Sequence, residues 1–252
     1  MHLQFCKNIL GVRNSTPNFI VYGELGRVPL DISIKLRIAS FWCRTIKTES
    51  KLSNILLRLM IKLHETNPTK FKWIQYVKSI FDDTGLSFIW NDQLVVNIDW
   101  LKSMVKQRLT YQYYQHWFSQ IHNASRGEFY SLFKLEFGLE PYLLRLLPKD
   151  RYYISKLRCS NLKLPIETGR WAGFARENRI CTLCNEGIGD EFHILFTCKN
   201  ADVSALRSKF IPINYYVMNP SKNKFTGLLS ICNVQVQRKL SIFVKKIIKY
   251  II

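Results

Sequence analysis

The chain has 252 residues, 47% of them hydrophobic, which is enough to bury a core in one or two domains and excludes a disordered tail. Its 37 lysines and arginines against 18 aspartates and glutamates give a formal net charge of +19. Such a charge favours polyanionic partners, with RNA or DNA ahead of an anionic membrane surface. The sequence shows no uncharged apolar run of about 18 residues, so we expect no transmembrane segment. It shows no secretory signal either, so we expect a reducing setting, nuclear or cytoplasmic.

The first 160 residues contain two kinds of pattern. Residues 1–30 have no clear periodicity, and we expect them to form an irregular connector. Over residues 31–160, apolar side chains recur at spacings of three and four, which predicts a helical domain whose longest helix covers residues 97–122. Its second helix is expected to begin at a Ser50 cap and to bury one apolar stripe. This stripe comprises Leu52, Ile55, Leu56, Leu59, Met60 and Leu63.

Asp82 and Asp83 follow an aromatic residue, as the paired carboxylates of a polymerase metal site do. Such a site needs a rigid turn between strands and a third carboxylate from an upstream strand. Here the pair ends a helix-period segment directly before Gly85, and no strand is predicted upstream. We therefore expect solvated aspartates at a helix end, and no enzyme activity.

Residues 145–179, the basic belt, are rich in lysine and arginine with aromatic residues between them. Cations contact phosphates, and aromatic faces stack on unpaired bases. The alternative is a solvated basic face. The first interpretation is favoured because the belt leads directly into the cysteine cluster that follows. We predict nucleic-acid contacts from Lys156, Arg158, Lys163, Arg170, Trp171, Arg176 and Arg179.

Residues 180–199 carry the pattern C-x2-C-x8-H-x4-C, formed by Cys181, Cys184, His193 and Cys198. Structural Zn²⁺ takes four tetrahedral nitrogen or sulfur ligands, so the pattern predicts a zinc module within residues 161–200. The alternatives are disulfide bonds, which the odd count of seven cysteines disfavours, and unrelated core cysteines. Four protein ligands leave no position for a reactive water, so we do not expect catalytic zinc. A short helix should end near Thr197 and let Cys198 turn back to the metal.

The remaining residues, 201–252, are predicted to form C-terminal helices. The last of them has an apolar face and a lysine-rich face. A basic amphipathic helix can lie on a membrane. At the end of a helical domain we expect it to be docked on the core instead.

Several segments resemble the region that follows the polymerase domain in reverse transcriptases of animal non-LTR (LINE-like) retrotransposons. They include V-Y-G-E-L-G-R-V-P-L-D-I, I-S-K-L-R-C-S-N-L-K-L-P-I-E-T-G-R-W, and R-E-N-R-I-C-T-L-C-N with D-E-F-H-I-L-F-T-C. The resemblance covers nearly the whole chain. It implies that the three cysteines and the histidine bind zinc in a C-terminal finger that helps to hold template RNA or target DNA. It also implies a polymerase domain of the same element as a partner.

The polymerase and endonuclease domains of that family have no counterpart in this sequence, so the resemblance does not transfer its activity. We predict a mainly α protein: an irregular multi-helix bundle, a small CCHC structural zinc module and a C-terminal amphipathic helix. The predicted function is that of a non-catalytic, nucleic-acid-binding remnant of such a reverse transcriptase. The alternatives are a protein-interaction or membrane-surface scaffold, and a pseudogene-like fragment without function.

Overall fold

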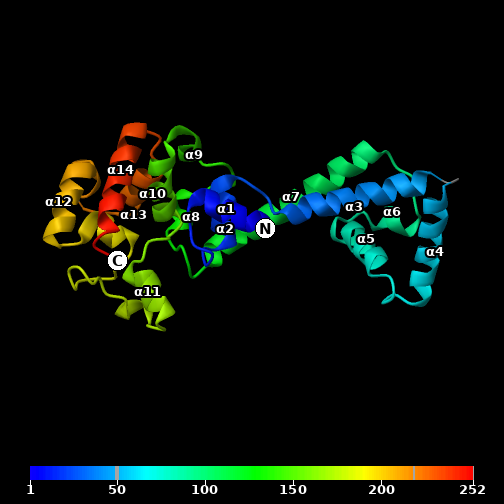
Figure 1. The fold of residues 1–252 in the computed structure, drawn as a ribbon, viewed down its shortest axis with the longest axis horizontal. Coiled ribbons are helices and arrows are strands. Elements are labelled where there is room, and N and C mark those ends of the chain that lie inside the picture. The colour runs from blue at the N-terminus through cyan, green and yellow to red at the C-terminus, as the bar shows by residue number, and fades with distance from the viewer. Residues whose placement is uncertain (49–50, 218, 252) are drawn as a thin grey trace. The chain divides into compact units, whose positions relative to one another are not determined.

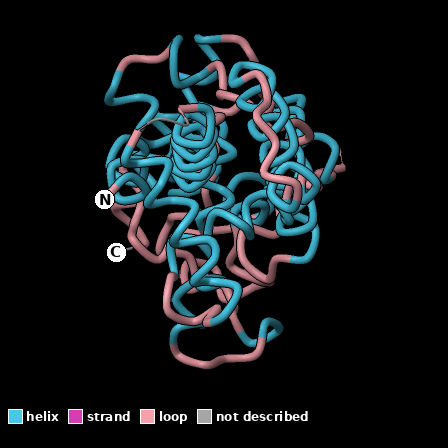
Figure 2. Tube along the Cα trace, turned by 90° about the vertical axis from the view of Figure 1, so that its right-hand side faces the viewer, coloured by secondary structure: helices cyan, strands magenta, loops and turns pink. Residues whose placement is uncertain are grey.

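The structure is a computed structural model that describes residues 1–48, 51–217 and 219–251 (Figure 1). The described residues form helices joined by loops and contain no β-strand (Figure 2). The prediction of a mainly α fold is therefore confirmed. The chain divides into two compact units: unit 1 comprises residues 1–27 and 119–252, and unit 2 comprises residues 28–118. These boundaries differ from those expected at residues 30 and 160, because unit 1 is built from two separate segments.

Unit 2 packs its helices around a cluster of large aromatic side chains. Its elements are α3 (Leu30–Lys47), α4 (Leu52–Thr66), α5 (Lys72–Asp83), α6 (Ser87–Asn91) and most of α7 (Ile98–Asn123). The rings of Trp42 and Phe81 meet edge to face at 4.9 Å, and the ring of Trp90 lies 5.9 Å from that of Trp42. Asp82 and Asp83 end α5 and are exposed, as predicted.

Helix α4 turns its apolar stripe to solvent, so the prediction that this stripe is buried is wrong. Its exposed members, the apolar face of α4, are 42–69% exposed: Leu52, Ile55, Leu56, Leu59 and Leu63. The buried side instead carries Asn54, Leu57 and Ile61. The amide of Asn54 donates to the carbonyls of Thr45 and Ile46 at 2.9 and 2.8 Å, at the end of α3. These bonds satisfy carbonyls that the helix end leaves free, and they fix which side of α4 faces α3. The predicted Ser50 cap lies outside the described residues.

Unit 1 contains most of the short helices. They are α1 (His2–Leu10), α2 (Asn18–Leu25), α8 (Tyr130–Phe133), α9 (Tyr142–Arg145), α10 (Pro148–Arg158), α11 (Pro165–Trp171), α12 (Ala201–Phe210), α13 (Lys222–Leu229) and α14 (Val234–Ile247). The prediction of an irregular connector over residues 1–30 is wrong, because α1 and α2 lie there. Helix α2 buries residues on several sides, including Ile20, Val21 and Leu25, so its sequence lacks the stripe that would have shown it.

A buried ion-pair cluster joins the two segments of unit 1. The Arg158 guanidinium donates from Nε and Nη2 to the two carboxylate oxygens of Glu24, both at 2.9 Å. It also pairs with Glu140 at 2.7 Å and donates to the Leu229 carbonyl at 2.6 Å. Burial alone lowers the pKa of Arg158, but the carboxylates raise it well above its usual range. The N-terminal segment is thus part of the core of unit 1.

The C-terminal helix α14 is docked, as predicted, with its apolar face against α10 and α12. Leu240, Phe243, Val244 and Ile247 are at most 2% exposed. Among the described residues, no helix is both long enough and apolar enough to cross a membrane.

Candidate metal centre

The first two candidate ligands lie in a tight loop closed by backbone hydrogen bonds. An antiparallel bridge joins Ile180 to Ile188, and the Cys181 N–H donates to the Gly187 carbonyl at 2.9 Å. Within the loop the Asn185 N–H donates to the Cys181 carbonyl at 2.8 Å. Asn185 and Gly187 have positive φ values of 56° and 66°, a conformation that asparagine and glycine tolerate best. The local sequence therefore turns the chain so that the thiols of Cys181 and Cys184 point to one side.

The other two ligands come from a π-helix, η2 (His193–Thr197). Asp190 starts this turn by accepting the His193 N–H on Oδ1 at 2.8 Å, and the Cys198 N–H closes it on the His193 carbonyl at 2.8 Å. A π-turn joins residues five apart, whereas an ideal α-helix would rotate them about 140° from one another. The predicted helix end near Thr197 is confirmed. The wider turn that brings His193 and Cys198 to the same side was not predicted.

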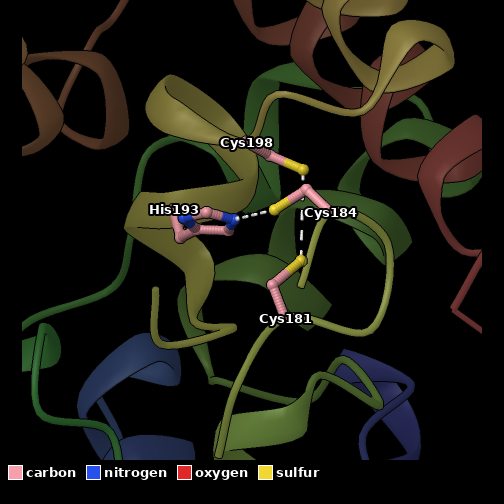
Figure 3. A group of neighbouring side chains, drawn as sticks. All are labelled: Cys181, Cys184, His193 and Cys198. Carbon is pink, nitrogen blue, oxygen red and sulfur yellow. Dashed lines mark hydrogen bonds between the residues drawn. The ribbon is translucent and has the colours of Figure 1, made fainter. Parts of the chain in front are cut away.

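Four potential ligand atoms converge on one point (Figure 3). All lie within 4.8 Å of one another. The sulfurs of Cys181 and Cys198 are 4.0 Å apart, and the Cys184 sulfur is 3.2 Å from His193 Nε2. A tetrahedral ion with sulfur bonds of about 2.3 Å separates its sulfurs by roughly 3.8 Å, close to the 4.0 Å between Cys181 and Cys198. All seven cysteines lie within the described residues, and each is free.

Outer contacts orient the ligands. The Thr197 hydroxyl lies 3.1 Å from His193 Nδ1, which leaves Nε2 to face the sulfurs. Arg207, which is 6% exposed on α12, donates to the carbonyls of Leu195 and Cys198 at 2.9 and 2.8 Å. A 2.6 Å ion pair from Lys199 to Glu186 joins the loop to the end of the π-helix. Sequence reasoning missed Arg207, because nothing local marks an arginine nine residues past the last ligand.

The surroundings shift the pKa values of three of the four potential ligands, Cys184, His193 and Cys198. Burial raises the pKa of the Cys198 thiol to about 12, and the neighbouring sulfurs add to the effect. Burial by itself raises the pKa of the Cys184 thiol as well. Hydrogen bonds with the backbone at Glu186 and Lys199 outweigh this effect, so the pKa of that thiol is lowered. Burial and the charge of Arg207 lower the pKa of His193, which keeps the imidazole neutral, as a metal ligand must be. The cluster could therefore hold a metal ion, and binding would release thiol protons.

The prediction that Arg158 contacts phosphate is wrong. Its side chain is 2% exposed and is surrounded by Glu24 and Glu140. The sequence offered no sign of this, because Glu24 lies 134 positions away.

The other three arginines predicted to contact nucleic acid also have partners within the protein. Arg170 donates to the Ser125 carbonyl at 2.6 Å, and Arg176 pairs with Glu128. Arg179 donates from all three guanidinium nitrogens to two backbone carbonyls. Each of these side chains is thus tied to another part of unit 1, and phosphate contact from these residues stays a prediction.

The remaining predicted contact residues are more open. Lys163 is exposed and has no ion-pair or hydrogen-bond partner among the described residues. Lys156 lies over the Tyr152 ring at 4.4 Å. Trp171 is 52% exposed, and the Arg13 guanidinium covers one of its faces at 4.6 Å. At most one face of this indole is free to stack on a base.

No protein-family model, curated protein or solved structure matches this chain. The resemblance to a reverse transcriptase region therefore stays a prediction.

Proposed function

We propose that this protein binds RNA or DNA without catalysing a reaction, and that a structural Zn²⁺ ion stabilises the module that supports binding. The zinc site is inferred from one observation: three sulfurs and one imidazole nitrogen lie within 4.8 Å of one another. This soft donor set favours zinc over magnesium or calcium, which take oxygen ligands. Four protein ligands complete a tetrahedral shell, so the ion has a structural role.

Nucleic acid is proposed as the partner from charge. An excess of 19 positive charges attracts phosphate, and the resemblance to the region after a retrotransposon polymerase supports the same partner. A polymerase domain of the same element is the protein partner that this resemblance suggests. A nuclear or cytoplasmic compartment would keep the thiols reduced. The membrane alternative loses its main support, because the apolar face of α14 is buried.

The metal is tested by measuring zinc bound to purified protein, in Cys184→Ser beside the control Cys232→Ser. Cys232 is exposed and lies outside the cluster, so its variant should keep one zinc per chain. Cys184→Ser should lose most of the metal and expose residues 180–200 to protease, because metal affinity contributes folding free energy. Full zinc occupancy in Cys184→Ser would overturn the metal proposal.

The partner is tested by the fluorescence anisotropy of labelled single-stranded RNA and DNA at increasing salt. Counterion release predicts an affinity that falls linearly on a log–log plot against salt concentration. Absence of binding at low salt, or binding that salt does not change, would reject the nucleic-acid role.

A further inference from the structure

Helices α10 and α14 pack together in unit 1 (Figure 1), and residues of both line a groove. Its volume is about 340 Å³. Its lining comprises Leu147, Lys149, Asp150, Tyr153, Arg238, Ser241, Ile242 and Lys245. None of these residues belongs to the metal cluster or to the contacts predicted from the sequence.

The groove carries cations that the protein does not use. Lys149, Arg238 and Lys245 are exposed and have no ion pair or hydrogen bond to any described residue. The four arginines predicted from the sequence to contact nucleic acid, in contrast, are held by carboxylates and carbonyls. One acidic residue lines the groove, Asp150, and its carboxylate is 8% exposed and accepts the Ser241 hydroxyl at 3.1 Å. Three cations against one carboxylate leave the groove positive.

The arrangement suits a row of phosphates better than a single anion. Arg238 and Lys245 are seven residues apart on α14 (Val234–Ile247), which places them two turns and about 10 Å apart on one side of the helix. Lys149 adds a cation from α10. Tyr153 and Ile242 supply apolar surface between the charges, as sugars and bases require. A flat bilayer surface could reach the outer lysines but would not fill the groove.

We propose that the groove between α10 and α14 binds the phosphate backbone of single-stranded nucleic acid. This inference rests on the proposed nucleic-acid function and moves its principal contact surface from the contacts predicted from the sequence to the lining of this groove, of whose three cations only Lys149 belongs to the basic belt. Because the contacts are to phosphate, binding there has little dependence on base sequence and is weakened by salt.

The test compares two double variants of the full chain that remove the same charge. Lys149→Gln with Lys245→Gln alters the groove. Lys209→Gln with Lys222→Gln alters two exposed lysines elsewhere in unit 1, neither of which has an ion pair to the described residues or is a predicted nucleic-acid contact. All four side chains are exposed, so both variants should fold, which circular dichroism checks. The probe is a fluorescein-labelled 20-nucleotide poly(U) RNA, measured by anisotropy over a range of salt.

We expect the groove variant to lose about tenfold or more in affinity, and its log–log salt slope to fall by about 1.4, the value for two lost single-strand contacts. The control variant should change affinity by less than about threefold and keep most of the wild-type slope. Equal losses in the two variants would show that overall charge, and not the groove, sets the affinity. If the groove variant binds RNA as tightly as the wild type does, the groove proposal is overturned, whereas the proposed function still stands.

Two further outcomes separate the remaining explanations. No RNA binding by the wild type would reject the nucleic-acid function, and the groove proposal with it. Phosphatidylserine vesicles serve as the second probe. If the groove variant loses vesicle binding as strongly as RNA binding, the surface recognises anionic surfaces in general, which would overturn the assignment to a nucleic-acid strand.

Discussion

Replacing Arg158 by methionine should destabilise unit 1 strongly. The substitution keeps an unbranched side chain of similar length but removes both hydrogen bonds to Glu24 and the ion pair to Glu140. The Glu24 carboxylate is fully buried, and without Arg158 it keeps only the Tyr142 hydroxyl, at 2.7 Å, as a side-chain donor. Breaking one side of a buried pair costs about 3–5 kcal/mol because the other charge stays in the core. Since a whole domain is stable by only about 5–15 kcal/mol, the loss should be plain in a urea titration.

The assay is urea unfolding followed by circular dichroism, with hydrogen exchange of α10 peptides to report on unit 1. Arg145→Met is the matched control, because Arg145 is exposed and has no ion pair to the described residues; its effect should stay within about 0.5 kcal/mol. Adding Glu24→Gln to Arg158→Met should restore part of the lost stability, because it removes the uncompensated charge. A loss below about 1 kcal/mol in Arg158→Met would refute the idea that this pair holds the two segments together.

Three further predictions concern packing and capping. Gly189→Ala should cost about 1–3 kcal/mol, read from the thermal midpoint, because a Cβ there would lie 2.6 Å from a proline ring carbon. Gly138→Ala, where a Cβ meets nothing within 4 Å, should cost less, and equal losses would contradict this. Asn200→Ala should lower stability by about 1 kcal/mol in urea unfolding, because its side chain accepts two backbone N–H groups in the first turn of α12. Trp42→Ala should lower the free energy of unfolding by about 3–5 kcal/mol, because Trp42 is fully buried. Phe41→Ala, on the same helix but at a side chain that is 57% exposed, should lower it far less. The reverse order of the unfolding midpoints would refute the assigned core.

The metal cluster was predictable because its geometry is local. All four ligands fall within 18 consecutive residues, and their types and spacing are those that zinc requires. The long helix and the docked α14 were predictable for a related reason: a strong apolar stripe has one energetically reasonable orientation in most folds. Helix α4 is the exception. Its burial is decided by the amide of Asn54, which completes the end of α3, and a single sequence cannot show that partnership.

The basic belt shows the other limit. A count of arginines gives the charge of a segment but not its partners, and those partners come from distant positions. Glu24 neutralises Arg158 across 134 residues, and Glu128 meets Arg176 across 48. The π-turn at His193 depends on hydrogen bonds that only the folded chain reveals. The free cations of the groove lie on α10 and α14, and the sequence did not show that these two helices pack side by side.

The apolar face of α4 has a practical consequence for solution work. Five large aliphatic side chains lie open to water in a protein of charge +19, and mutual repulsion opposes contact between molecules at low ionic strength. Added salt shortens the Debye length from about 30 Å at 0.01 M to about 3 Å at 1 M. The electrostatic repulsion between molecules is then screened, whereas the hydrophobic attraction between the exposed α4 faces remains. The salt titration proposed above as the test of RNA binding should therefore also drive the protein's molecules together. Light scattering recorded alongside anisotropy would keep colloidal association from being mistaken for a change in affinity.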